Sequence, residues 1–258
     1  MRIIVAGGRG WLGSALCRLL IDDGHDVVVL SRSRPTLSVK PGPRFVTWDG
    51  QTLAEWASEV DGADAIVNFS GESIAGARWT AKRKRLLRSS RIEPTAVLVD
   101  AIAAATDRPG VLVNASAVGY YGDRGEETVM EDTAPGTDFL ARLVVDWEAA
   151  ALRAVDLGTR TVVLRMGVVI GPGGGALDRL VMPFRWFVGG PIGFGNRWLP
   201  WIHIDDVVGL FRFALEREDV SGPINAVAPE PATYRDLAVA IGRALGRPSW
   251  CPDRKSVV

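Results

Sequence analysis

The sequence has little cysteine and no excess of either charge. Two cysteines in 258 residues, Cys17 and Cys251, provide neither a disulfide framework nor a set of metal ligands. So few thiols fit a reduced, cytoplasmic compartment. Thirty basic residues balance thirty acidic ones, which gives no reason to expect nucleic acid or an anionic membrane as a partner.

Long apolar runs are also missing. No run reaches the length of a membrane span, and the first residues read as a strand rather than as the apolar core of a signal peptide. With 47% apolar and 23% charged residues, the composition is that of an ordinary globular protein. A chain of this length can form one large α/β domain, alone or with a small appended lobe.

A glycine-rich turn near the start organises the rest of the chain. The apolar residues 3–5 precede Gly7, Gly10 and Gly13, and an amphipathic segment over 14–20 follows. This order predicts a strand, a tight turn and a helix whose first N–H groups face an anion. We therefore expect a dinucleotide phosphate site rather than a plain turn, formed by Gly7, Arg9, Gly10, Trp11, Leu12 and Gly13.

The end of the second predicted strand, residues 26–30, indicates which dinucleotide binds. An NAD site would place an acid here for the ribose 2′-hydroxyl, but the chain has Ser31, Arg32, Ser33 and Arg34. Guanidinium and hydroxyl groups suit a 2′-phosphate, and Arg9 could add a second cation. The alternative is that Arg32 and Arg34 are solvated turn residues. We predict NADP(H).

Two further strand ends supply candidate cofactor contacts. A strand over 45–48 leads to Asp49, which either reaches the adenine side of the cofactor or starts a turn. A short helix is expected over 53–60. The strand over 65–69 ends at Phe69 and leads into Ser70 and Gly71. We expect Phe69 and Ser70 beside the nicotinamide ribose and Gly71 among the cofactor contacts.

A long helix is predicted over 79–105, and its first half carries six basic residues. Such a run can bind nucleic acid, but the apolar face that follows favours an amphipathic surface helix. Arg91 is nearest the apolar half, and we expect it to point inward at a phosphate.

The candidate catalytic groups follow a strand predicted over 111–114. Ser116, Tyr120 and Tyr121 place a hydroxyl and two phenols at the carboxyl end of that strand, where they could polarise a carbonyl or an alcohol. The alternative is that both tyrosines are core aromatics beside a loop.

Four motifs together carry a family resemblance: the opening glycine turn, residues 116–122, residues 146–148 and residues 201–206. The chain resembles the atypical extended short-chain dehydrogenases/reductases called the epimerase family, which are NADP-dependent oxidoreductases related to nucleotide-sugar epimerases. The likeness extends over about residues 1–248. It implies an α/β fold with a Rossmann-type, doubly wound parallel sheet and a small C-terminal substrate lobe. In related folds, residues just past the strand over 161–165 touch the nicotinamide, which makes Val169 a candidate contact.

The resemblance also exposes a gap. Active extended reductases carry a Tyr-x-x-x-Lys pair, in which Tyr is the acid/base and Lys lowers its pKa. None of the three tyrosines here has Lys four positions on, and the expected sites on the helix over 139–155 hold Leu140 and Val144. A proton must then come from Tyr120, which we prefer, from Tyr121 or Ser116, or from a substrate-side acid.

The C-terminal part is expected to form the lobe. Residues 1–171 would be the NADP domain, completed near 201–217, residues 172–248 mostly the lobe with a mobile lid, and 249–258 a disordered or truncated tail. We expect Asp205 to cap a helix over 207–216 and His203 to bond the backbone. A strand over 223–228 and a helix over 234–245 are assigned to the lobe.

These features predict an NADP(H)-dependent oxidoreductase or epimerase-like enzyme acting on a small hydroxyl- or carbonyl-bearing molecule, with a nucleotide-linked substrate as one form. The missing Tyr-Lys pair leaves open an alternative: a catalytically silent NADP(H)-binding regulator or scaffold, for example in cell division. Helices that flank such a sheet commonly pair, so a homodimer is among the expected assemblies.

Overall fold

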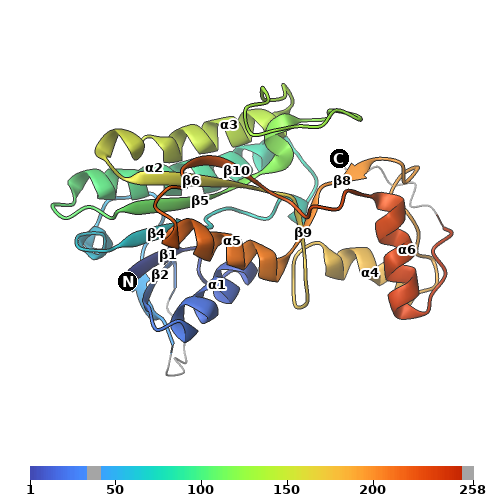
Figure 1. The fold of residues 1–258 in the computed structure, drawn as a ribbon, viewed down its shortest axis with the longest axis horizontal. Helices are drawn as coiled ribbons and strands as arrows, with labels where there is room; N and C mark the ends of the chain where they lie inside the picture. The colour runs from blue at the N-terminus through green and yellow to red at the C-terminus, as the bar shows by residue number, and fades with distance from the viewer. Residues whose placement is uncertain (34–41, 252–258) are drawn as a thin grey trace.

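The computed structural model describes residues 1–33 and 42–251 (Figure 1). Arg34, the residues that follow it up to 41, and residues 252–258 of the predicted tail lie outside these ranges. No helix within the described ranges is long and apolar enough to cross a membrane.

A seven-stranded sheet forms the centre of the molecule, and every neighbouring pair in it is parallel. Its order, β10-β6-β5-β4-β1-β2-β3, reverses direction between β1 and β4. The predicted doubly wound Rossmann-type sheet is confirmed. Ligands bind at such a reversal, beyond the carboxyl ends of the strands. The strands are β1 (Arg2–Ala6), β2 (Asp26–Ser31), β3 (Arg44–Thr47), β4 (Ala65–Asn68), β5 (Val111–Ala117), β6 (Arg160–Met166) and β10 (Gly222–Ala226).

Helices cover both faces of this sheet (Figure 1). The helices α1 (Trp11–Asp22) and α5 (Ile204–Glu216) pack with one set of alternating strand residues. The helices α2 (Ala81–Ala104) and α3 (Phe139–Leu152) lie on the opposite face, where α2 packs with the other set. Because both faces are covered, the central strands are buried throughout, as their continuous apolar runs require. Short 3₁₀ helices lie between these elements: η1 (Glu55–Glu59), η2 (Ile74–Gly76), η3 (Val118–Tyr121) and η4 (Val155–Leu157).

A small lobe lies beside the carboxyl edge of the sheet (Figure 1). Its helices α4 (Leu177–Arg185) and α6 (Tyr234–Leu245) share a separate core of Phe184, Ala238 and Ile241. The short strands β8 (Trp198–Leu199) and β11 (Ala232–Thr233) pair antiparallel, while β7 (Val168–Ile170) pairs in parallel with β9 (Trp201–His203). The chain passes through the lobe twice, with α5 and β10 between the two passages.

Two local predictions were wrong. The strand assigned to the lobe, β10, instead extends the main sheet beside β6. Helix α5 begins at Ile204, three residues before its predicted start, and its N-cap is His203 rather than Asp205. The Nδ1 atom of His203 accepts the Asp205 N–H at 3.3 Å, so His203 does bond the backbone. Asp205 and Asp206 lie in the first turn, where a negative charge favours the helix dipole.

Candidate functional site

The glycine turn joins β1 to α1 at the reversal of the sheet. Gly7 has a φ of 75°, and a Cβ there would lie 2.9 Å from the carbonyl carbon of Phe69 at the end of β4. A Cβ at Gly13 would lie 2.5 Å from the carbonyl oxygen of Gly7. Both positions therefore require glycine, because the backbones of the turn, the helix and β4 approach one another directly.

The first turn of α1 offers hydrogen-bond donors to an anion. Gly10 is the N-cap and has no side chain to satisfy the N–H groups of Trp11, Leu12 and Gly13. These N–H groups have no carbonyl partner within the helix, and the dipole of α1 adds positive potential at the same place. A phosphate bound here would accept hydrogen bonds from these N–H groups, and its negative charge would be stabilised by the dipole.

A cleft of about 370 Å³ lies beyond this turn. Nine predicted cofactor residues line it: Gly7, Arg9, Gly10, Ser31, Arg32, Asp49, Phe69, Ser70 and Gly71. The structure thus brings together residues from the ends of β1, β2 and β4 and from just beyond β3, as expected for strands that end at the same edge.

Arginine and serine side chains form the wall of the cleft after β2. Nη1 of Arg9 donates to both the carbonyl and the hydroxyl oxygen of Ser33, at 3.0 and 2.6 Å. The Ser31 hydroxyl also donates to the Ser33 carbonyl, at 2.9 Å. Arg32 is exposed and lines the cleft beside them. The arrangement concentrates positive charge and hydroxyl groups where an NAD site would have a carboxylate.

Asp49 starts a turn, the second of the two roles left open for it, and its contact with the adenine side of a cofactor stays a prediction. Its carboxylate accepts hydrogen bonds from the Thr52 hydroxyl and from the N–H groups of Thr52 and Gln51, so it does start a turn. Led by the bond from the Thr52 hydroxyl, these bonds lower the pKa of Asp49 to about 2. The residue also lines the cleft.

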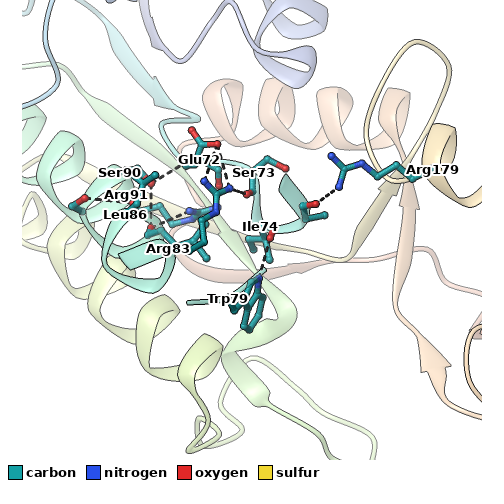
Figure 2. A network of polar contacts seen from close by, with 12 residues as sticks. Glu72, Ser73, Ile74, Trp79, Arg83, Leu86, Ser90, Arg91 and Arg179 are labelled. Atoms are coloured by element: carbon teal, nitrogen blue, oxygen red, sulfur yellow. Dashed lines mark hydrogen bonds and ion pairs between the residues drawn. The ribbon is translucent and has the colours of Figure 1, made fainter. Parts of the chain in front are cut away.

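The loop after β4 is held by two arginines of α2 (Figure 2). Arg83 forms an ion pair with Glu72 at 3.3 Å and donates to the carbonyl of Ser73. Arg91 points inward, but not at the cleft: its guanidinium donates to the carbonyls of Glu72 and Leu87, at 2.9 and 3.0 Å. Burial lowers the pKa of Arg91 to about 10. The geometry therefore differs from the prediction, since Arg91 fixes the loop rather than facing a phosphate.

The same loop also contacts the lobe. Arg179, from α4, donates to the carbonyl of Ala75, and the Trp79 indole donates to the carbonyl of Ile74 (Figure 2). The loop after β4, which lines the cleft, is therefore linked to the lobe through the backbone carbonyl of Ala75.

Trp11 links the phosphate turn to the lobe from the other side. Its indole N–H donates to the carbonyl of Pro172 at 3.0 Å. A Cβ at Gly174 would lie 2.6 Å from Cγ of Trp11, so the ring lies directly on the glycine segment that leads to α4. The side chains of Leu12 and Val169 pack against the main core, and Trp11, Leu12, Gly13, Arg91 and Val169 do not line the cleft.

Two of the three candidate catalytic hydroxyls lie in a buried polar network. Ser116 is inside β5 and its hydroxyl donates to Glu148 of α3. Arg165, from β6, binds both carboxylate oxygens of Glu148, at 2.9 and 2.8 Å. It also donates to the Tyr121 hydroxyl, which donates in turn to the Asn225 side chain at 2.6 Å. Burial lowers the pKa of Arg165, but the hydrogen bonds that its guanidinium donates to Glu148 and Tyr121 raise it by more, so the guanidinium is held charged.

Tyr120 differs from its neighbours. It is half-buried, its ring lies under the guanidinium of Arg165, and its hydroxyl has no hydrogen bond to any residue that the structure describes. The positions expected to hold Tyr and Lys are apolar: Val144 is buried, and Cβ of Leu140 is 3.7 Å from where a Cβ of Gly119 would lie. Within 1–33 and 42–251 no group of His, Cys, Asp and Glu could hold a metal ion.

Sequence reasoning missed one whole wall of the cleft. Helix α2 contributes Leu86, Ser89, Ser90, Glu93 and Pro94. Their spacing of three and four residues is the signal that could have identified a single helix face. It also missed the pairing of Glu148 with Arg165, because the sequence showed the first only as part of a motif and the second only as the end of a strand.

Comparison with known proteins gives consistent matches. The model of the NAD dependent epimerase/dehydratase family matches residues 3–227. The chain is 42% identical to the human epimerase family protein SDR39U1 over 261 residues, covering 100% of this chain and 85% of the relative. It is 38% identical to the Bacillus subtilis epimerase family protein YfhF, covering 98% of this chain and 82% of that relative.

Solved structures of proteins with related sequences have the same fold as this chain. Human SDR39U1 (isoform 2), crystallised with NADPH, superposes with a TM-score of 0.87 at 41% identity, covering 98% of this chain and 82% of that one. A nucleoside-diphosphate sugar epimerase from Corynebacterium glutamicum has a TM-score of 0.79 at 36% identity, covering 98% of this chain and 53% of that one.

Proposed function

The chain belongs to the NAD-dependent epimerase/dehydratase family, and on that basis we propose that it binds NADP(H) in the cleft beyond the glycine turn. It acts there as an oxidoreductase or epimerase-like enzyme on a small molecule that carries a hydroxyl or carbonyl group. The similarity to a nucleoside-diphosphate sugar epimerase supports a nucleotide-linked form of that substrate.

The observation that carries the proposal is the pair of cations beside the end of β2, Arg9 from the glycine turn and Arg32 from the strand end. Arg9 and Arg32 line the cleft with Ser31, and no acid occupies the end of that strand. Guanidinium groups bind a 2′-phosphate by charge-assisted hydrogen bonds, whereas a 2′-hydroxyl calls for a carboxylate. The relative SDR39U1, crystallised with NADPH, supports the same choice.

The remaining cleft residues fit the other parts of this cofactor. The N–H groups at the start of α1 would hold the pyrophosphate, and Phe69, Ser70 and Gly71 would line the nicotinamide ribose. Val169 stays a predicted contact of the nicotinamide end. When bound, the nicotinamide supplies or accepts a hydride.

Tyr120 is the proposed proton donor or acceptor. Its hydroxyl is available, whereas Ser116 and Tyr121 already bond Glu148, Arg165 and Asn225. By giving up or taking the proton at its hydroxyl oxygen, the Tyr120 phenol would complete the reduction of a carbonyl, or the reverse oxidation of an alcohol.

A second candidate function rests on Leu140 and Val144. Neither side chain can move a proton, which favours a silent NADP(H)-binding regulator or scaffold, with a role in cell division as one case. A cytoplasmic location, a homodimer and the predicted domain boundaries also stay predictions.

One screen separates the two functions. The protein is mixed with NADPH and with panels of carbonyl compounds and nucleotide sugars, and NADPH oxidation is followed. Turnover with any member supports the enzyme. Tight NADPH binding with no turnover across the panels favours the regulator. Absence of NADPH binding would contradict both.

A further inference from the structure

Besides Asp49, the charged residues that line the cleft come from different elements according to their sign. Arg9 and Arg32 come from the β1 and β2 side, whereas Glu72 and Glu93 come from the loop after β4 and from α2. A dinucleotide phosphate carries its negative charge on the 2′-phosphate and the pyrophosphate, and those groups belong with the arginines and the start of α1. Glu72 and Glu93 are therefore expected to face the uncharged parts of the cofactor.

The position of Glu93 is fixed by the residue after it. A Cβ at Gly50 would lie 3.4 Å from Cγ of Pro94, so this part of α2 packs on the turn at residues 49–51. Trp48, Asp49, Gly50 and Gln51 line the cleft at the same end. Glu93 therefore stands where the cleft is bounded by the turn after β3, the side on which a Rossmann-type fold holds the adenosine half of its cofactor.

Glu93 is also the carboxylate at that end that has no hydrogen-bond partner among the described residues. Both oxygens of Asp49 already accept hydrogen bonds from Thr52 or Gln51. Glu93 is exposed to the cleft and has no hydrogen bond or ion pair with any other described residue. A carboxylate accepts hydrogen bonds and donates none, so its natural ligand is a group that carries N–H or O–H.

We propose that Glu93 is a specificity-determining residue that accepts a hydrogen bond from the 6-amino group of the cofactor's adenine. This inference rests on the proposed binding of NADP(H) in the cleft. The exocyclic amine is the donor on the six-membered ring of adenine. Hypoxanthine has a carbonyl oxygen at position 6 and carries its donor at N1 instead, so a carboxylate placed at position 6 loses its hydrogen bond and is repelled. Glu93 thus selects adenine over hypoxanthine in the dinucleotide.

The test compares two cofactors on two proteins. Dissociation constants for NADPH and for reduced nicotinamide hypoxanthine dinucleotide phosphate are measured by titration calorimetry, with the native chain and with Glu93→Ala. The native chain is expected to bind NADPH about tenfold more tightly than the hypoxanthine analogue, as for one charge-assisted hydrogen bond. In Glu93→Ala this ratio should fall to about one. The ratio is used because removing a negative charge strengthens the binding of both anionic ligands equally.

Asp100→Ala is the matched control. Asp100 is another exposed acid on α2 and pairs with Arg153 instead of lining the cleft, so its removal should leave the tenfold ratio unchanged. Equal affinity of the native chain for the two cofactors, or the same ratio in Glu93→Ala, would overturn the assignment of Glu93. Failure of NADPH to bind the native chain would instead overturn the proposed function, so the two failures are distinguishable.

Discussion

The guanidinium carbon of Arg165 lies 3.5 Å from the centroid of the Tyr120 ring. The same guanidinium binds Glu148, which accepts the Ser116 hydroxyl, and it donates to the Tyr121 hydroxyl. Arg165 is therefore the common neighbour of all three hydroxyls that sequence reasoning selected. Of the three hydroxyls, that of Tyr120 is the one without a hydrogen bond to any described residue.

Replacing Tyr120 should affect substrate turnover without affecting NADPH binding. In Tyr120→Phe, turnover of any substrate found by the screen should fall by about 100-fold or more, the usual contribution of a general acid or base. The dissociation constant for NADPH should not change, because Tyr120 does not line the cleft. Tyr234→Phe, on the lobe helix α6, is the control. Unchanged turnover in Tyr120→Phe would move the proton transfer to another group.

Breaking the buried ion pair should cost stability. Arg165→Met leaves Glu148 charged and buried, and its free energy of unfolding in urea should fall by about 3 kcal/mol or more. The double variant Glu148→Leu/Arg165→Met should lose less than Arg165→Met alone, because neither charge is then left unpaired. Arg88→Met breaks an exposed pair with Asp146 and should cost under about 1 kcal/mol. Equal losses in Arg165→Met and Arg88→Met would contradict this account.

Arg32 should decide between the two dinucleotides. NADPH is expected to raise the melting temperature of the native chain more than NADH does. Arg32→Ala should weaken NADPH binding by about 10- to 100-fold and leave NADH binding nearly unchanged, since only NADPH carries the 2′-phosphate. Arg217→Ala removes the same charge at the far end of α5 and serves as control. If Arg32→Ala weakened NADPH and NADH binding equally, the assignment of Arg32 to the 2′-phosphate would be wrong.

The two cysteines should react at very different rates. Cys17 is buried under the glycine turn, with its Sγ 3.2 Å from where a Cβ of Gly8 would lie. Burial raises its pKa to about 12, so at pH 8 the thiol is protonated as well as covered. A disulfide reagent at pH 8 should modify Cys251 quickly and Cys17 slowly, and saturating NADPH should slow Cys17 further. Equal rates for both thiols in the folded protein would argue against this packing.

Gly174 should tolerate no side chain while Trp11 is present. Gly174→Ala places a methyl group against the indole and should lower the free energy of unfolding by about 1–3 kcal/mol. In a Trp11→Ala background the same change should cost much less. Gly209→Ala, in α5, meets no atom within 4 Å and should stabilise the protein by about 0.5–1 kcal/mol. A Gly174→Ala loss that persists without Trp11 would mean that the indole is not the obstacle.

Local patterns explain what the sequence predicted well. The glycine turn, the alternation of strands with helices and the bounds of α6 depend on neighbouring residues, and the structure has them where they were expected. The prediction of the N-cap of α5 was wrong for a local reason too. Asp is usually a better N-cap than His, so the prediction chose Asp205, whereas the structure has His203 there.

Contacts between distant segments explain what was missed. Tyr121 meets Asn225 across 104 positions and Arg165 meets Glu148 across 17, and no spacing rule relates such residues. Arg91 shows what helical periodicity can and cannot predict. Its position on α2 predicts that its side chain points inward, but not that it binds backbone carbonyl groups instead of a phosphate.

The double passage of the chain through the lobe constrains the order in which the protein can fold during synthesis. Strand β10 completes the main sheet only after α4, β8 and β9 have left the ribosome, and α4 must then wait for α6 to cover Phe184. The main sheet cannot be completed before synthesis of the lobe has begun, and the lobe cannot be completed before synthesis of the sheet has begun. The lobe therefore cannot be removed as one continuous piece, and a transplant would have to carry two separate segments of chain.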